Sequence, residues 1–321
     1  MDARKKYIGW VSLIAGTVLM LFSCRHKDLC YEEAPVSQVE VAFDWSKAPQ
    51  AKVASMRVFL YPEDGGKVMT YEFANMQGGP VMLPEGNYRA ICINSDTEAL
   101  LYKNIHTYEE FMVSTPVGLV NGMVFSALQM KKKAVAYSVQ TSPDDFYSDN
   151  LSSVHIRSAS GKQRIVFYPE MAFCRYRIKM INVINLQHVY LGSVTGGLSG
   201  LSEVFYVGRN VIDNDRAIVP FNMKRRGDST LTASFFALGQ SKYDDEHKVA
   251  IHVRLQDGSE KCYVFDVTQQ IHEAPDPRNV LILLDGMVIP DTLDYEHEEK
   301  NEGGFKPSLD DWEDVNVDLD M

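Results

Sequence analysis

The chain has 321 residues, and its 45% hydrophobic and 11% aromatic content excludes a wholly disordered protein, because this is enough apolar material for a core. At roughly 100–200 residues per domain, the length predicts about two domains. The formal net charge of −11 argues against a general nucleic-acid binder, which depends on clustered Lys and Arg, and five cysteines are too few for a disulfide-dense miniprotein.

The N-terminus has the pattern of a secretory signal. A basic start at residues 2–6 precedes an uncharged run over 7–22, which is shorter than the ~20 residues that a membrane-spanning helix needs. The run ends in Leu21-Phe22-Ser23-Cys24, which resembles a bacterial lipobox. This resemblance implies that residues 1–23 are removed as a signal peptide and that Cys24 carries a lipid. An ordinary signal peptide with an incidental Cys24, or an uncleaved anchor, is the alternative.

Period-two alternation of apolar side chains predicts strands through the first half of the chain. Val39, Val41 and Phe43 share one face of a strand over residues 38–45. Further strands are expected over residues 56–61, 67–73 and 88–93.

Two other segments of this half read differently. Residues 95–106 have helical character, with Asp96 or Thr97 as a candidate N-cap. Residues 123–139 read as one long or two short strands around Lys131-Lys132-Lys133. We interpret that basic triplet as a solvated strand end rather than a contact patch.

The second half repeats the strand pattern more clearly. Apolar residues alternate over 174–180, 231–237 and 249–255, and Asp257-Gly258 predicts a hairpin turn into a strand over 261–267. A short helix over 266–272 and a final buried strand over 280–284 follow. The polar stretch 140–161, rich in Ser, Asp and Pro, is the predicted domain boundary.

Short strands, hairpin turns and few amphipathic helices predict an all-β fold of two tandem β-sandwiches. We place the N-terminal sandwich at residues 31–140 and the C-terminal sandwich at 160–290. Residues 291–321 form an acidic C-terminal tail, in which eleven acids of 294–321 stand against two lysines. A mobile tail is the default for such a segment. Val315, Val317 and Leu319 nevertheless alternate with polar residues, so a strand that docks on a partner or on its own sandwich is the alternative.

The sequence contains no recognisable catalytic or metal-binding motif. None of the eight histidines lies in a metal-ligand pair, and the glycine-rich Gly196–Gly200 lacks the Lys-Ser/Thr ending of a phosphate loop. Cys92 and Cys174 lie inside apolar strand patterns, which favours buried thiols over a disulfide. We therefore predict no catalytic residues, no metal site and no cofactor.

Several segments together resemble the fimbrillin-related lipoproteins of Bacteroidales, which include FimB-type anchor subunits of type V pili. The similar segments, beside the lipobox at 21–24, lie at 39–45, 83–94, 195–205, 231–239, 280–290 and 304–321. The resemblance implies transthyretin-like sandwiches and a lipid-anchored outer-membrane protein, most simply an anchor or accessory subunit of a fimbria that is assembled by β-strand addition. Its partners would be the outer membrane and other fimbrial subunits. The alternative function is a surface lipoprotein that binds glycan or host protein through a sandwich face.

The lipobox generates a direct test. In cells that make the Cys24→Ala variant, we expect the protein to leave the membrane fraction and appear in the soluble envelope fraction or the medium. The physical reason is that acyl chains supply about 0.8 kcal/mol per buried CH₂, and the variant has no thiol to carry them. Fractionation and immunoblotting measure the change, and unchanged membrane retention would contradict lipidation at Cys24.

Overall fold

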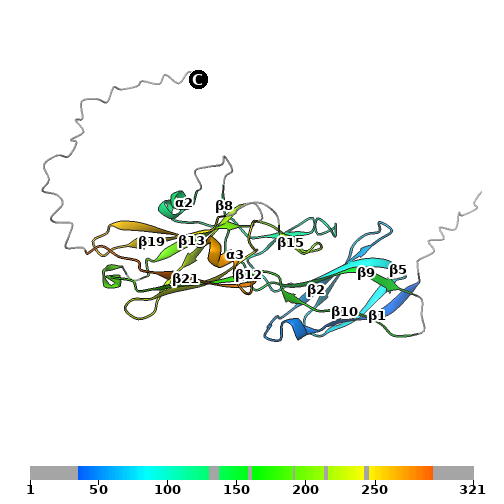
Figure 1. The fold of residues 1–321 in the computed structure, drawn as a ribbon. Coiled ribbons are helices and arrows are strands. Elements are labelled where there is room, and N and C mark those ends of the chain that lie inside the picture. Colours follow the sequence, from blue (N-terminus) through cyan, green and yellow to red (C-terminus); the bar gives the residue numbers. More distant parts are fainter. Residues whose placement is uncertain are drawn as a thin grey trace, which may run out of the picture.

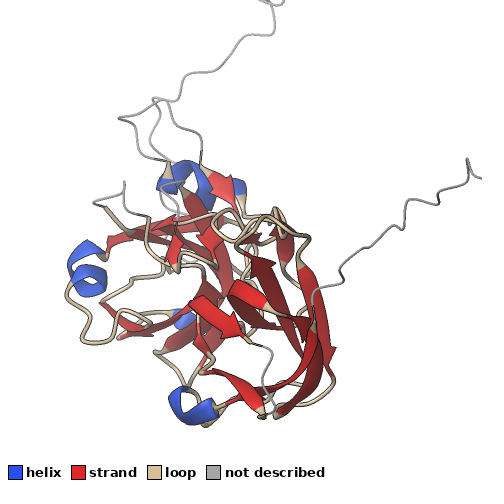
Figure 2. Cartoon of the chain, turned by 90° about the vertical axis from the view of Figure 1, so that its right-hand side faces the viewer, coloured by secondary structure: helices blue, strands red, loops and turns tan. Residues whose placement is uncertain are grey.

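The computed structural model describes residues 35–129, 137–157, 161–190, 192–212, 216–241 and 246–291. Within these ranges the protein is nearly all β, which confirms the predicted fold class, and two stacked groups of sheets lie along one long axis (Figure 1). Strands make up most of the fold, and the helices are few and short (Figure 2). No helix among the described residues is long and apolar enough to cross a membrane.

The N-terminal sandwich packs a three-stranded sheet, in the order β10-β1-β4, against a five-stranded sheet, in the order β11-β9-β5-β2-β3. The strands of the smaller sheet are β10 (Gln163–Phe167), β1 (Val36–Phe43) and β4 (Gly78–Pro84). Those of the larger sheet are β11 (Glu170–Met171), β9 (Tyr147–Ile156), β5 (Gly86–Asn94), β2 (Met56–Pro62) and β3 (Met69–Phe73). Val39, Val41 and Phe43 of β1 face the core as their alternation predicts, and a 3-10 turn at Trp45–Lys47 ends the strand.

The C-terminal sandwich packs a four-stranded sheet, in the order β17-β18-β12-β21, against a five-stranded sheet, in the order β20-β19-β13-β16-β8. The four strands are β17 (Lys224–Arg225), β18 (Leu231–Ala237), β12 (Cys174–Ile181) and β21 (Asn279–Asp285). The five are β20 (Glu260–Asp266), β19 (Lys248–Arg254), β13 (Thr195–Leu201), β16 (Ala217–Asn222) and β8 (Ser138–Val139). The short helices are α2 (Gly122–Leu128), α3 (Thr268–His272) and a 3-10 turn at Leu186–His188.

The predicted domain boundary over residues 140–161 is wrong, because the chain passes repeatedly between the two sandwiches. Strand β9 pairs with β5, and β10 pairs with β1, so residues assigned to the linker and to the second domain complete the first sandwich. Conversely, α2 and β8 pack on the second sandwich. The polar side chains that give β9 the composition of a linker bond backbone groups instead: Asp149 accepts the N–H of Tyr168 at 2.7 Å, and Asn150 donates to the Val207 carbonyl at 3.3 Å.

Two secondary-structure predictions also fail. Residues 95–106 form no helix, because the carboxylate of Asp144 accepts the N–H groups of Glu98 and Ala99, and β6 (Leu101–Lys103) pairs with β7 (Met112–Ser114). Residues 123–128 lie in α2 rather than in a strand; the Asn121 side chain caps this helix. The short apolar run fits both the 3.6-residue period of a helix and the two-residue period of a strand. Burial of Val124 and Leu128 against the five-stranded sheet favours the helix.

The sandwiches meet at a junction with its own sheet and core. Strands β6 and β7 continue into β14 (Phe205–Tyr206) and β15 (Val211–Ile212), so residues from both halves of the chain share one sheet. The junction cluster buries aromatic rings, including Phe111, Phe146 and Phe173. Phe146 and Phe173 stack with ring centroids 4.9 Å apart. These contacts tie the two sandwiches together over a substantial apolar surface.

Gly208 allows the closest approach at this junction. A Cβ at this position would lie 1.9 Å from the Tyr108 carbonyl oxygen. We therefore expect Gly208→Ala to lower the free energy of unfolding by about 1–3 kcal/mol or more, because the clash is with backbone that cannot rotate away. Urea denaturation measures the change. Gly122→Ala is the matched control, since its Cβ meets nothing within 4 Å; equal effects of the two substitutions would contradict the prediction.

Candidate subunit-interaction site

On one side of the C-terminal sandwich, each sheet ends in a strand whose outer edge has no neighbouring strand among the described residues. Strand β20 is the last strand of one sheet and β21 is the last strand of the other. Helix α3 connects them and lies between the two layers (Figure 1). The Tyr263 hydroxyl donates to the Val288 carbonyl at 2.8 Å, so the two edges flank the same side. We call this region, made of β20, α3 and β21, the open side.

Strand β20 presents the longer unpaired edge. The N–H of Val267 bonds to the His247 carbonyl, and the N–H of Leu255 bonds to the Ser259 carbonyl, which fixes the phase of the β19–β20 ladder. In an antiparallel pair, alternate residues point their backbone groups away from the partner strand. The N–H and C=O groups of Glu260, Cys262 and Val264 therefore face outward, where no described residue pairs with them. Val264 is also 47% exposed.

Strand β21 is partly capped. The side-chain amide of Gln270, on α3, donates to the Leu283 carbonyl at 3.0 Å and accepts the Leu283 N–H at 2.8 Å. This amide imitates one residue of a neighbouring strand. The outward backbone groups of Leu281, two residues away, have no partner among the described residues, and a hollow of about 540 Å³ beside them is lined by α3 and the turn that follows it.

Side chains between the two edges are only partly covered. Tyr263 and Phe265 of β20 pack against the core cluster of this sandwich but remain partly exposed. An extended segment that paired with β20 would complete their burial while satisfying the free backbone groups. The open side therefore has the two features that strand addition requires, which are unpaired main-chain groups and apolar side chains at alternate positions.

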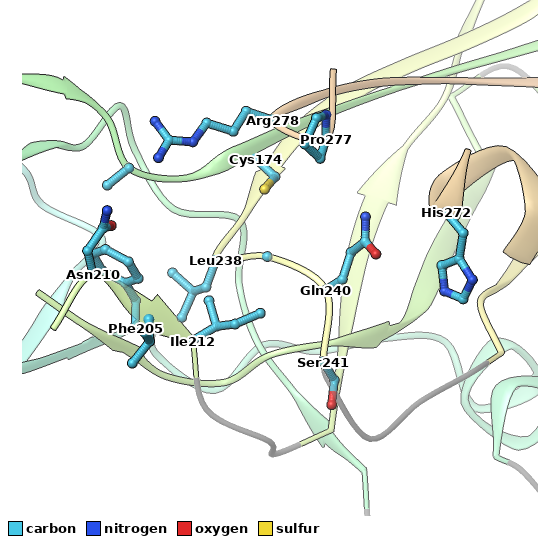
Figure 3. Close-up of a pocket in the computed structure, with 13 residues that line it drawn as sticks. Cys174, Phe205, Asn210, Ile212, Leu238, Gln240, Ser241, His272, Pro277 and Arg278 are labelled. Carbon is cyan, nitrogen blue, oxygen red and sulfur yellow. The ribbon is translucent and has the colours of Figure 1, made fainter. Parts of the chain in front are cut away.

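A second hollow, of about 540 Å³, lies near the junction of the sandwiches (Figure 3). Its wall includes Cys174, Asn210, Gln240, His272 and Arg278. Arg278 is engaged by Glu170 at 3.1 Å. Burial raises the pKa of the Cys174 thiol to about 11, so this sulfur is protonated at neutral pH and is a poor nucleophile. The hollow therefore contains polar groups but no thiolate nucleophile.

Two histidines of the C-terminal sandwich are buried. His247 is fully buried, and its ring packs edge-on against His272 with centroids 5.1 Å apart. His252 is buried beside Glu260, with Nε2 3.2 Å from the carboxylate. No group of three metal-ligating side chains gathers within the described part of the chain. The burial of His252 follows from α2, which packs on β19 and whose N-cap Asn121 lies 3.4 Å from Nε2 of this histidine, whereas His247 is buried beside His272 of α3.

The predicted site residues Cys24, Val315, Val317 and Leu319 lie outside the described residues, as does Lys131-Lys132-Lys133. Cys92 is a buried free thiol, as preferred over a disulfide, and Cys174 and Cys262 are partly exposed free thiols. Gly196 and Gly197 serve packing rather than a ligand: a Cβ on Gly196 would lie 2.6 Å from the Ala250 carbonyl oxygen and the Phe221 ring. The sequence had no signal for the open side, because pairing partners are set by topology.

The fold and the open side define an all-β module of two joined sandwiches with an available sheet edge. The chain belongs to the family described as "Domain of unknown function (DUF5119)", whose model matches residues 23–222. A curated relative, the "Putative fimbrium anchoring subunit Fim4B" of Bacteroides ovatus, is 26% identical over 239 residues, which cover 74% of this chain and 67% of the relative. This relative confirms the resemblance to anchor subunits drawn from the sequence.

Solved structures share the fold. The crystal structure of a "putative adhesin" from Bacteroides ovatus has a TM-score of 0.62 at 22% identity and covers 84% of this chain and 98% of its own. A second "putative adhesin" from Bacteroides ovatus has a TM-score of 0.50 at 12% identity, with 79% and 89% covered. At these identities the likeness supports the β-sandwich architecture.

The raised pKa of Cys174 generates a test of the junction hollow. At pH 8 a thiol of pKa about 11 is almost wholly protonated. We expect iodoacetamide to modify it about two orders of magnitude more slowly than an ordinary thiol of pKa about 8.5, with the rate rising as the pH approaches 11. Peptide mass spectrometry follows the modification, and the urea-unfolded protein is the control. Rapid labelling of the folded protein at pH 7 would reveal an activated sulfur and contradict this assignment.

Proposed function

We propose that this protein is an anchor or accessory subunit of a fimbria, held at the outer membrane by lipid on Cys24, and that it contacts another fimbrial subunit by β-strand addition at the open side. The role is structural rather than catalytic. The curated relative named as a fimbrium anchoring subunit supports the class of function. The open side is the observation that carries the mode of contact.

The placement of the chain ends supports an anchoring role. The described chain begins at Pro35, beside β1, and ends at Asp291, beyond β21, at opposite ends of the long axis (Figure 1). Lipid on Cys24 would therefore hold the N-terminal sandwich toward the membrane. The C-terminal sandwich, with the open side, would then point away from it, where another subunit can approach.

The far end of the C-terminal sandwich adds exposed apolar surface. Ile184, Tyr190 and Val288 are 52%, 61% and 53% exposed. Ile184 and Val288 form an isolated bridge at the end of β21. Apolar side chains that remain exposed next to an unpaired edge would be buried by a subunit that continued along the same axis.

The glycan-binding alternative has little support in the described residues. A flat aromatic platform needs exposed Trp or Tyr rings side by side, and the exposed Tyr168 and Tyr190 belong to different sandwiches. Trp45 is instead structural, since its Nε1 donates to the Met76 carbonyl at 2.8 Å and its ring packs edge-on against Tyr147. Trp10 and Trp312 lie outside the described residues.

The test blocks the β20 edge without breaking its own ladder. Proline at position 264 removes an N–H that faces outward, so pairing with β19 is retained, and such substitutions are tolerated on edge strands. We expect Val264→Pro to reduce, by at least tenfold, the recovery of other fimbrial subunits in a pull-down from crosslinked cells. Quantitative mass spectrometry of the captured proteins measures this recovery.

Val264→Thr is the matched control, because threonine keeps both the N–H and the β-branched shape. Circular dichroism and thermal unfolding verify that both variants fold like the parent protein. Equal recovery of fimbrial subunits with the parent and Val264→Pro would contradict the assignment of the β20 edge as the contact site. Recovery of no fimbrial subunit with any of the three proteins would contradict the fimbrial function itself.

A further inference from the structure

One sheet face of the C-terminal sandwich is strongly basic although the whole chain carries a net charge of −11. Arg175, Arg177 and Lys179 project from the outer face of β12 at alternate positions and are exposed. Register places Lys179 opposite Thr232, which lies opposite Lys224 of β17. We call the basic side chains of this surface the basic face; they are Arg175, Arg177, Lys179, Lys224 and the exposed Arg226.

The basic face is concave, and no described acidic side chain pairs with the cations that line its hollow. A hollow of about 420 Å³ is lined by Arg177, Lys179, Lys224 and Arg226 together with small polar side chains of β18. Within the described ranges, no carboxylate lies in ion-pair distance of these four side chains. Like charges held this close repel one another, so an anionic ligand would relieve that repulsion.

An apolar strip lies beside the basic face. Leu281 stands next to Arg177 and Leu283 next to Lys179 in the β12–β21 register. These leucines are 54% and 49% exposed. The predicted buried strand over 280–284 is thus buried on one face only, through Val280, Ile282 and Leu284. The outer surface therefore suits a ligand that is both acidic and apolar.

The C-terminal segment 294–321 has this composition. It carries eleven acids and two lysines. Its apolar residues are spaced among the acids, at Phe305, Leu309, Trp312, Val315, Val317 and Leu319. No other stretch of comparable length in the chain combines so many acids with so few bases.

The segment also starts close enough to reach the basic face. The described chain ends at Asp291, shortly after β21, whose last residues lie beside Lys179 and Ile181. An extended chain spans at most ~3.3–3.6 Å per residue, so residues 292–321 can cover roughly 100 Å. The strand length from Arg175 to Lys179 is only about 13 Å. A tethered segment also benefits from an effective concentration in the millimolar range.

We propose that the acidic segment 294–321 binds in cis to the basic face and the Leu281–Leu283 strip of the same molecule. Its carboxylates pair with the basic side chains, and its apolar residues cover the leucines. The contact is intramolecular and weakens with salt, because exposed ion pairs are screened over about 3 Å at 1 M ionic strength. This inference does not depend on the fimbrial function, since it concerns one chain only.

Carbodiimide crosslinking of the full-length protein, purified in detergent, tests the contact directly, because the reagent joins a lysine amine to a touching carboxylate. We expect amide links from Lys179 and Lys224 to Asp or Glu residues of 294–321, identified by peptide mass spectrometry. The yield of these links should fall at least fivefold in 1 M NaCl. Lys52 and Lys67, exposed on the N-terminal sandwich, serve as internal controls and should form no such links.

Charge-reversal variants sharpen the test. Arg177→Glu should lower the yield of the Lys179 and Lys224 links at least fivefold, whereas Lys52→Glu should leave it unchanged. A mixture of unlabelled and ¹⁵N-labelled protein separates cis from trans contacts, and only links within one isotope are expected. Links between isotopes would assign the segment to a second copy. That result, absent links, or links spread evenly over all exposed lysines would each overturn the proposal.

Discussion

The burial of aromatic rings at the junction is the interaction on which the rest of this architecture depends. Phe111, Phe146, Phe173 and Phe205 come from segments far apart in the sequence and share one core between the sandwiches. The chain crosses this region repeatedly, since β8 and α2 belong to the C-terminal sandwich while β9 and β10 return to the N-terminal one. A module joined in this way resists bending more than two domains on a single linker.

The polar residues where the chain crosses between the sandwiches form specific hydrogen bonds. A polar stretch such as residues 140–161 is ordinarily a linker, because polar side chains gain little from burial. Here Asp149 accepts the N–H of Tyr168, between β10 and β11, and Asn150 donates to the carbonyl of Val207, a residue of the junction cluster. Removing the Asp149 side chain would take away the acceptor of the Tyr168 N–H, whereas the Val207 carbonyl would still accept the N–H of Asn210 at 3.2 Å.

Much of the fold follows from the sequence, because alternation is a local property. Strands β1, β12, β18 and β19 appear where their apolar residues alternate, and Asp257-Gly258 makes the expected turn, with Gly258 at a φ of +90°. What the sequence could not supply depends on contacts between distant residues. The helix α2 is decided by burial of Val124 and Leu128, and the absence of a helix at 95–106 is decided by Asp144. The candidate site likewise depends on contacts between distant residues, since a strand is an edge strand only when no other strand pairs with its outer side.

An unpaired edge is also a hazard, because it invites uncontrolled pairing with other chains. Natural edges carry charges, and β20 has Glu260, Lys261 and Asp266 at its ends, while β21 has the amide of Gln270 over Leu283. The centre of β20, at Cys262 and Val264, has neither protection. Charged side chains thus protect the ends of the β20 edge, and its middle remains available for pairing. This arrangement is expected where pairing with one specific strand is useful and non-specific pairing is harmful. An acidic segment held on the neighbouring basic face would add like-charge repulsion between copies, and so favour one selected partner over self-association.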